Sequence, residues 1–253
     1  MKPLIYIIAF MFIGFHAVAS EESTAHAAFN QANQAYKEGH YVEALEYYQQ
    51  VAEENEGVTI NYNLGNTYFK LDKLPESILY YERALKFDPA NADVLHNLRL
   101  VNDMIVDRID NLPQSKAQIW WKEFRYGLGP DGWAWVSIGL AAVAVILLAL
   151  YYVSAIRNIR RFGFFAGIIS LMMMALTIAL AQSAATYRNT HNSGVVFTDK
   201  VDIKSEPRES STNVFVLHAG TKVSILAQDG EWYEVKIASG NQGWIKAVDF
   251  EQI

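Results

Sequence analysis

Two long apolar stretches joined by a short arginine-bearing connection constrain this chain most strongly. Residues 133–152 and 164–184 contain no charged side chain. Each stretch of about 20 residues is long enough to cross about 30 Å of hydrocarbon as a helix. The connection, residues 153–163, holds Arg157, Arg160 and Arg161 and no acid. The sequence therefore predicts a two-helix membrane hairpin whose arginines lie outside the hydrocarbon.

The side of the membrane follows from the same arginines. Short loops rich in Arg stay preferentially in the cytoplasm, so we expect residues 153–163 to be cytoplasmic and the flanking segments to be extracytoplasmic. Residues 1–19 agree, because Lys2 precedes an apolar run that ends in an Ala-Val-Ala sequence before Ser20. This is the pattern of a secretory signal peptide. An uncleaved signal anchor is the alternative, and it gives the same topology.

Composition limits the classes of function. The 253 residues leave room for two small domains beside the hairpin, not for one large enzyme core. There is no cysteine, so thiol catalysis and disulfides are excluded. The six histidines are not paired at metal-ligand spacing, and no nucleophile or phosphate-loop motif is present. A net charge of −6 gives no indication of the basic surface that binds nucleic acid. We expect a non-enzyme without a metal or cofactor.

An internal repeat occupies residues 25–91. Aromatic, small and polar residues recur 33 positions apart, as in the pairs Phe29 and Tyr62, Asn33 and Asn66, and Tyr36 and Phe69. A fixed period of this length is typical of helical repeat proteins. The second unit has Leu64-Gly65 followed by Tyr68, with small and aromatic residues further on and Pro89 at its end; this resembles the tetratricopeptide repeat. The units predicted are residues 25–57 and 58–91.

A third amphipathic stretch, residues 92–110, is predicted to be a closing helix because its apolar residues recur at helical spacing. Two repeats and one helix fall below the roughly three repeats that usually form a stable array. Two explanations stay open at this point. Either the helix and the membrane-proximal segment complete the core, or a partner protein covers the open face.

The resemblance to tetratricopeptide repeats implies a concave groove lined by the first helix of each unit. Asparagines there could pair with a peptide backbone, and the aromatic residues beside them offer apolar contact, although each aromatic could equally be a core residue. We expect alanine at both asparagines to weaken partner binding without unfolding the domain. The candidate groove residues are Phe29, Asn33, Tyr36, Lys37, Tyr62, Asn66, Phe69 and Lys70.

A tryptophan-rich linker, residues 113–132, precedes the first apolar stretch. Trp and Tyr favour the headgroup region of a bilayer, because one end of the ring is apolar and the other forms a hydrogen bond. The sequence predicts an interfacial anchor here, and a substrate site built from the same rings is the less favoured reading. The predicted anchors are Trp120, Trp121, Trp133 and Trp135.

Short alternating apolar runs separated by turn residues fill positions 194–253. Val223 and Ile225 alternate with polar residues, as do Tyr233, Val235 and Ile237, and this period of two predicts half-buried strands. Asp229-Gly230 predicts a hairpin turn. Five or six such strands suggest a small β-barrel. The segment resembles the bacterial SH3 domain, in which Trp232 and Trp244 would be either core residues or a ligand face.

The predicted fold class is therefore multidomain: an all-α tetratricopeptide-repeat solenoid over residues 20–112, a transmembrane hairpin and an all-β SH3-like barrel. This order resembles the E protein of the Bacteroides aerotolerance operon family, and the junction at residues 129–135, Gly-Pro-Asp-Gly-Trp-Ala-Trp, is its most specific part. The resemblance implies an envelope-stress scaffold that accompanies von Willebrand factor A domain proteins and a MoxR-type ATPase.

Two functions compete on the sequence. The first is a protein-interaction scaffold that docks onto other membrane-anchored or periplasmic proteins from the outer side of the inner membrane. The second is an adaptor whose barrel binds peptidoglycan and whose solenoid recruits a remodelling enzyme. A transporter is disfavoured because neither apolar stretch contains an ionisable group.

Overall fold

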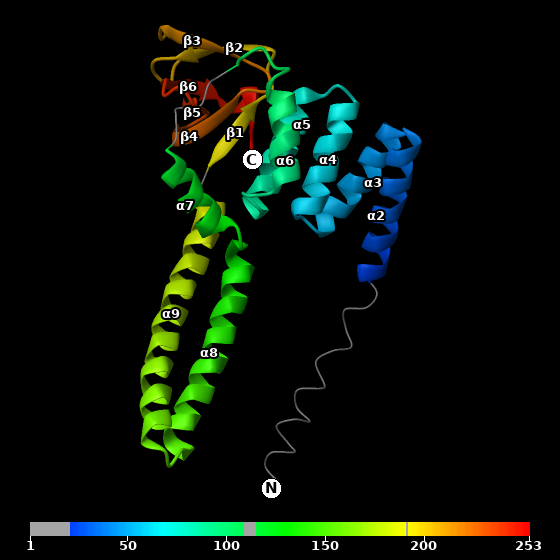
Figure 1. The fold of residues 1–253 in the computed structure, drawn as a ribbon. Helices are drawn as coiled ribbons and strands as arrows, with labels where there is room; N and C mark the ends of the chain where they lie inside the picture. The colour runs from blue at the N-terminus through cyan, green and yellow to red at the C-terminus, as the bar shows by residue number, and fades with distance from the viewer. Residues whose placement is uncertain (1–20, 109–114, 191) are drawn as a thin grey trace.

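The computed structural model describes residues 21–108, 115–190 and 192–253. The predicted signal peptide (residues 1–19), residues 109–110 of the predicted closing helix and residues 113–114 of the predicted linker lie outside these ranges. A helical array and an all-β domain lie side by side at one end of a long helical hairpin (Figure 1). The predicted fold class is confirmed.

Helix pairs build the array, and the repeat in the sequence explains them. Each pair is one unit of the 33-residue period, and a fifth helix follows the second pair. Asn91 caps that last helix, because its side chain accepts a hydrogen bond from the Val94 amide. It ends earlier than the spacing predicted, so Ile105 lies beyond it in a bend. The helices are α2 (Glu21–Glu38), α3 (Tyr41–Glu54), α4 (Val58–Lys70), α5 (Leu74–Phe87) and α6 (Ala92–Asn102).

The hairpin is formed by two long helices, with a shorter helix at its upper end. These are α7 (Lys116–Tyr126), α8 (Gly129–Val153) and α9 (Arg157–Thr190). Both α8 and α9 are long and apolar enough to cross a membrane, and most of their residues are exposed, unlike those of a soluble core helix. The predicted linker is thus largely helical, with Pro130 in the first turn of α8.

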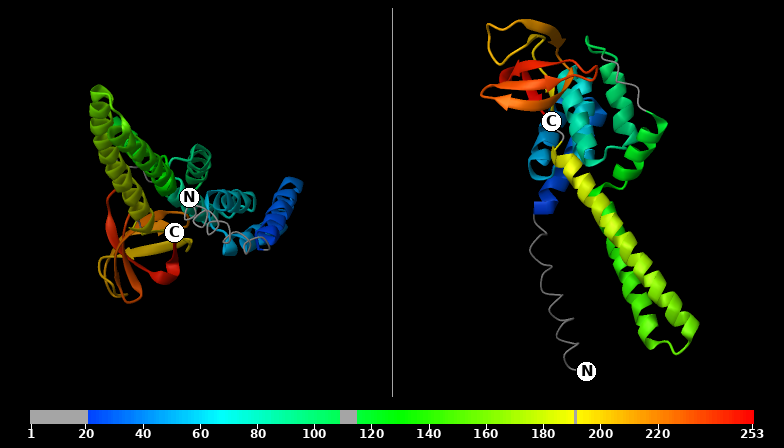
Figure 2. Two further views of the ribbon diagram at one scale, coloured as in Figure 1. Left: turned by 90° about the horizontal axis from the view of Figure 1, so that it is seen from below. Right: turned by 90° about the vertical axis from the view of Figure 1, so that its left-hand side faces the viewer.

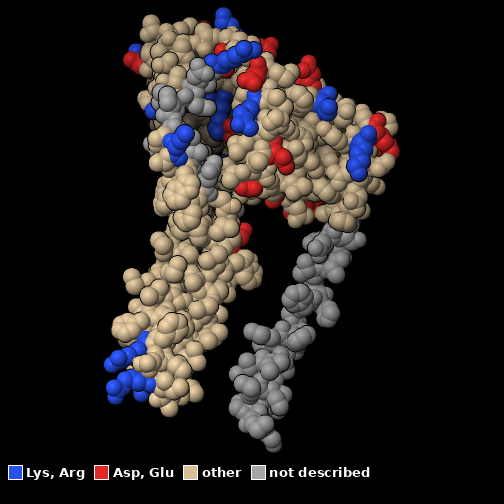
Figure 3. All heavy atoms as spheres, viewed as in Figure 1, with Lys and Arg blue, Asp and Glu red and all other residues tan. Residues whose placement is uncertain are grey.

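The connection between α8 and α9 is shorter than predicted. Only Ser154 to Ile156 separate the helices, and Arg157, Arg160 and Arg161 lie in the first turns of α9. Arginine is a good helix former, so the charges that should end the apolar span do not end the helix. In Figure 3, basic side chains gather at this far tip of the hairpin.

Polar contacts join α8 to α9 inside the apolar region. The hydroxyls of Ser137 and Thr177 are 2.9 Å apart, and Ser170 donates to the carbonyl oxygen of Leu140 at 2.8 Å. At Gly163 an added Cβ would lie 2.8 Å from the Leu147 carbonyl oxygen, so only glycine permits this approach. Hydrogen bonds and small residues are the usual means of packing helices in lipid.

The β-domain is one antiparallel sheet in the order β3-β2-β6-β5-β4-β1-β7. Residues from both ends of this order, such as Ile203, Leu217 and Phe250, share one buried cluster, so the sheet curls around its own core. The hairpin turn between β4 and β5 is Gly230-Glu231, one residue later than predicted, because Asp229 pairs with Trp232. The strands are β1 (Ser193–Val196), β2 (Lys200–Lys204), β3 (Asn213–His218), β4 (Lys222–Asp229), β5 (Trp232–Lys236), β6 (Gln242–Lys246) and β7 (Phe250–Gln252).

The array and the β-domain share a hydrophobic core. Ile78 and Leu79 of α5 and Val94 of α6 lie in one buried cluster with Val195 of β1, and Phe197 and Ile253 pack against it. Figure 2 shows the sheet next to the helices of the array both from below and from the side. The cover at this end is intramolecular, as one of the two explanations expected, but only α6 was expected correctly: the β-domain, not the membrane-proximal segment, packs with α6 on the last complete repeat.

A substitution at Gly220 would test the packing between the array and the β-domain. The Gly220 φ of +91° disfavours any side chain, and an added Cβ would lie 2.7 Å from Ile105 of the array. We expect Gly220→Ala to lower the free energy of unfolding by about 2–4 kcal/mol, from backbone strain and overpacking. Gly230→Ala is the matched control, because Gly230 also has a positive φ (+58°) but no atom within 4 Å of the added Cβ. It should cost about 1 kcal/mol. Equal losses in thermal melts of the full chain would contradict the packing described.

Candidate interaction surfaces

The two repeats use the same tyrosine–asparagine hydrogen bond. Tyr48 donates to the Asn33 Oδ1, and Tyr81 donates to the Asn66 Oδ1, both at 2.7 Å. Burial raises the pKa of Tyr48 to about 12, and it raises the pKa of Tyr81 as well, so both hydroxyls stay protonated as donors. Each bond joins the first helix of its unit to the second. The sequence repeat therefore corresponds to a repeated contact.

Asn33 and Asn66 therefore have a structural role in addition to any role in binding. Alanine at either position would leave the hydroxyl of a buried tyrosine without its acceptor, which typically costs about 1–3 kcal/mol. In the second unit the contact extends to α6, since Asn97 donates to Asn66 Oδ1 at 2.9 Å and to the Tyr62 hydroxyl at 3.2 Å. A cost in stability is therefore expected from these substitutions in addition to any loss of binding.

The remaining candidate groove residues divide into two kinds. The aromatic ones are half-buried and pack against the core clusters, so they serve the array as well as any groove: Phe29, Tyr36, Tyr62 and Phe69. Lys37 and Lys70 are exposed. These lysines can be replaced with little effect on packing, and they are the better positions for a test of binding.

Trp232 and Trp244 share the outer face of the β-domain. Strand pairing sets Trp232 opposite Lys246 and Trp244 opposite Glu234, whereas the alternate residues Val235 and Ile245 belong to the core. The Lys246 Nζ lies 5.5 Å from the centre of the Trp232 ring. Both tryptophans are half-buried and lie outside the core cluster. Both tryptophans therefore lie on the rim of the barrel and not in its core.

A carboxylate after α6 fastens the array to the β-domain. Asp107 accepts hydrogen bonds from the His218 amide (2.6 Å), the His218 Nδ1 (2.8 Å) and the Thr221 hydroxyl (2.7 Å). Burial raises the pKa of Asp107, but the hydrogen bonds from Thr221 and His218 outweigh it, and the pKa lies below the ordinary value of 3.8. Sequence analysis missed this residue, because its partners lie more than 100 positions away.

Ion pairs surround the same junction. Lys222 of β4 approaches the largely buried Glu82 of α5 at 2.6 Å, and Arg83 contacts Glu251 at 2.9 Å. Lys86 donates to the main-chain oxygen of Ile253 at 2.5 Å. An open cavity of about 930 Å³ lies beside these contacts. Its basic side chains, Arg83 and Lys86, are therefore already engaged by the β-domain.

Aromatic rings collect where α7 meets the hairpin. Phe124 stacks on both Trp120 and Trp121 and makes an edge contact with Trp133. The Trp133 Nε1 donates to the Arg125 carbonyl oxygen at 2.9 Å, while the Arg125 guanidinium bonds to Ser183 of α9. Trp120, Trp121 and Trp135 are exposed and Trp133 is buried. Three of the four predicted anchors thus present their rings outward at one end of the apolar helices.

Comparison with known proteins assigns the two soluble parts. Residues 59–91 match the tetratricopeptide repeat family, and residues 199–250 match the bacterial SH3 domain family. Both are binding domains, not catalytic ones. The all-β domain is hereafter called the SH3-like domain. The chain therefore combines a protein-interaction repeat with a module of the protein-interaction or cell-wall-binding kind.

Individual relatives cover only parts of the chain. YrvJ of Bacillus subtilis, which is named as an N-acetylmuramoyl-L-alanine amidase, is 25% identical over 75 residues; this is 30% of the present chain and 14% of YrvJ. The chain thus spans a small part of that relative, and the amidase activity is a statement about YrvJ alone.

Solved structures resemble the two parts weakly. The C-terminal SH3 domain of Entamoeba histolytica myosin IB is 16% identical and has a TM-score of 0.19, over 25% of this chain and 93% of that one. An NlpC/P60 family protein from Bacillus cereus is 18% identical with a TM-score of 0.22, over 28% and 23%. Yeast Tom70 is 16% identical with a TM-score of 0.32, over 69% and 27%. Scores this low add nothing to the two family matches.

The Asp107 junction predicts a defined pH dependence. A carboxylate whose folded pKa lies below its unfolded value, about 3.9, stabilises the fold fully above that value and loses this effect as pH falls through the folded pKa. We expect Asp107→Asn to lower the free energy of unfolding by about 1.5–3 kcal/mol at pH 5, with the difference from wild type shrinking toward pH 3. Asp103→Asn is the control, since Asp103 is exposed. Urea unfolding at several pH values measures both; a difference that grows toward pH 3 would contradict the assignment.

Proposed function

We propose that the protein is a non-catalytic scaffold, anchored in a membrane by α8 and α9, that presents two binding surfaces on one rigid body. The shared core of α5, α6 and β1 is the observation that carries this proposal. It fixes the array against the SH3-like domain, while the lysines of the groove and the two outer tryptophans remain accessible. A rigid pair of surfaces suits a protein that holds partners in a set arrangement.

The proposed topology places both soluble domains outside the cytoplasm. The first turns of α9 carry three exposed arginines, at the opposite end of the hairpin from the soluble domains. Charge bias of this kind favours a cytoplasmic tip. The exposed rings of Trp120, Trp121 and Trp135 at the other end suit the outer interface of the inner membrane. The match to a bacterial SH3 domain agrees with an extracytoplasmic location.

The proposed partners are other membrane-anchored or periplasmic proteins. The resemblance of the 129–135 junction and of the domain order to the aerotolerance family supports a complex with von Willebrand factor A domain proteins and a MoxR-type ATPase system. With no cysteine in the chain, any role in oxygen tolerance would be indirect, through assembly.

A second candidate function is binding of peptidoglycan by the SH3-like domain. The outward position of Trp232 and Trp244 favours it, because half-buried aromatic rings on the outer face of the sheet, beside Glu234, can stack on a polar ligand. The likeness to a stretch of YrvJ, a protein named as a cell-wall amidase, points in the same direction.

Single cysteines test the topology, because the natural chain has none. Ser154→Cys places a thiol at the hairpin tip, and Ser211→Cys places one in the loop between β2 and β3. A membrane-impermeant maleimide added to cells with a permeabilised outer membrane should label Ser211→Cys and spare Ser154→Cys until the inner membrane is lysed. The reverse pattern would invert the proposal.

Paired surface variants separate the two functions. If the scaffold proposal is correct, Lys37→Ala combined with Lys70→Ala should reduce co-purification of von Willebrand factor A domain proteins severalfold after cross-linking in cells. Trp244→Ala should leave it unchanged. If the wall proposal is correct, the intact protein in detergent should sediment with purified peptidoglycan, and Trp232→Ala or Trp244→Ala should abolish sedimentation.

Matched controls remove the same chemistry elsewhere. Lys200→Ala deletes an exposed lysine of β2, and Leu226→Ala deletes an exposed apolar side chain of β4. Loss of binding in these controls would mean that neither the groove nor the tryptophan face is the site. Thermal melts of each variant confirm that the fold is retained.

A further inference from the structure

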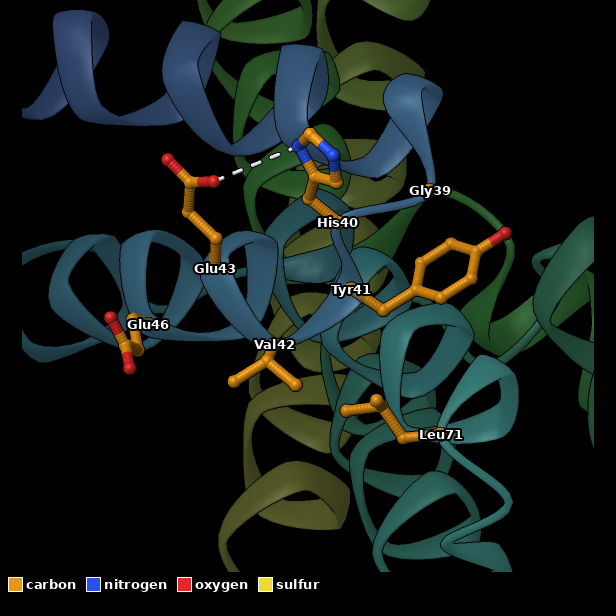
Figure 4. A pocket seen from close by; sticks show the side chains of 7 residues that line it. All are labelled: Gly39, His40, Tyr41, Val42, Glu43, Glu46 and Leu71. Carbon is orange, nitrogen blue, oxygen red and sulfur yellow. Dashed lines mark ion pairs between the residues drawn. The ribbon is translucent and has the colours of Figure 1, made fainter.

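An open apolar cavity lies at the turn ends of the two repeats, away from the SH3-like domain (Figure 4). It has a volume of about 430 Å³. Helix α3 supplies one wall, and the end of α4 supplies the other. The lining residues are Gly39, His40, Tyr41, Val42, Glu43, Glu46 and Leu71.

Local structure fixes the apolar part of this cavity. Gly39 ends the first helix with a φ of +83°, and the His40 amide bonds to the Ala35 carbonyl oxygen at 2.9 Å, so α3 starts in a defined direction. Tyr41 is held by an edge contact with Tyr36, with ring centres 5.3 Å apart. Val42 and Leu71 point toward the same space from opposite walls, whereas the Tyr41 ring is turned away from the space between them (Figure 4).

Val42 is unusually open for an apolar residue in such a position. Its side chain is 62% exposed although it lies in a hollow with two other large apolar residues. Apolar surface that is concave and rimmed by polar groups is the kind that docks another molecule. The Val42 side chain is not part of the buried core of the array.

The rim of the cavity is acidic. Glu43 and Glu46 lie one turn apart on α3, and Glu38 stands nearby; the carboxylates of Glu38 and Glu43 are 3.7 and 3.8 Å from the His40 Nδ1. Among the described residues, none of these three acids forms an ion pair with a lysine or arginine. Lys73, two positions after Leu71, lies over the Tyr68 ring instead.

We propose that this cavity docks a segment of a partner protein in which an apolar side chain stands next to a lysine or arginine. The apolar side chain would enter between Val42 and Leu71. The neighbouring cation would lie against Glu43 and Glu46, neither of which forms an ion pair with a lysine or arginine among the described residues; the Glu43 carboxylate lies 3.8 Å from the His40 Nδ1. This surface is distinct from the concave groove and from the tryptophan face, so it is testable even if neither of those binds a partner.

The expected selectivity is modest and depends on salt. Exposed ion pairs change affinity by a small factor each, so two glutamates should favour a cationic segment over a neutral one about threefold to tenfold at low salt. The preference should shrink at about 1 M salt, where the Debye length is only about 3 Å and exposed charges are screened.

Disulfide capture at position 42 measures this selectivity on the intact protein. Because the chain has no cysteine, Val42→Cys gives a single thiol in the full chain purified in detergent. The probes are the symmetrical disulfides of acetyl-Leu-Lys-Cys-amide, acetyl-Leu-Gln-Cys-amide, acetyl-Leu-Glu-Cys-amide and acetyl-Ala-Lys-Cys-amide. Intact mass gives the captured fraction of each after equilibration with excess 2-mercaptoethanol.

The proposal predicts that the Leu-Lys probe is captured best, ahead of Leu-Gln and then Leu-Glu, and that Ala-Lys is captured less well than Leu-Lys. Adding Glu43→Gln and Glu46→Gln should remove the preference for the cation. Gln31→Cys is the matched control, because it places an exposed thiol on α2, outside the cavity and with no acidic residue three or four positions away; it should capture the four probes equally.

Three results would each overturn the proposal. Equal capture of all probes at position 42 would show that the cavity selects nothing. The same order of capture at position 31 would show that the preference belongs to the protein surface in general. A cation preference that survives the two glutamine substitutions would show that Glu43 and Glu46 are not its source.

Discussion

The contact between α5 and β1 is the interaction on which the rest of the soluble structure depends. A solenoid of two repeats leaves an apolar face at its end, and a short array of this kind is only marginally stable. Here Val195 and Phe197 enter the cluster formed by Ile78, Leu79 and Val94, so the SH3-like domain acts as the terminal cap of the array. The two small domains thereby form a shared buried cluster, in addition to the separate core of each domain.

This packing also determines where the open surfaces lie. The SH3-like domain uses β1, β7 and the turn before β4 to hold the array, and its outer tryptophans lie on β5 and β6. β1 begins three residues after α9 ends, so the rigid body sits close to the upper end of the hairpin. A scaffold built in this way would hold both surfaces near a bilayer and at a constant distance from each other.

The features that could be predicted from the sequence are those that repeat within a single element or unit. The 33-residue repeat, the two uncharged stretches and the alternation at Val223 and Ile225 are each properties of a single element, and each element was found near its expected place. The ends of elements were less predictable. The arginines of the hairpin tip continue a helix instead of ending it, and the turn after β4 moved by one residue because Asp229 joins the strand.

Contacts between distant segments could not be predicted. Nothing in the sequence near Asp107 indicates that its carboxylate binds the turn at His218 and Thr221, since that pairing exists only once the array and the SH3-like domain have packed. The roles of Asn33 and Asn66 were half predicted. Their repetition in the sequence indicated that both positions have a role. The hydrogen bonds that they accept from tyrosines depend on how the helices pack, which the sequence does not show.

The shared core requires the two domains to move as one body, and a distance distribution between them would reveal any independent motion. Spin labels on cysteines at Gln50 of α3 and Glu231 of the β4–β5 turn, both exposed, report on the array and on the SH3-like domain. Pulsed electron paramagnetic resonance on the full chain in lipid nanodiscs should give one narrow distribution. A broad or bimodal distribution would show that the domains move independently, and would contradict the account.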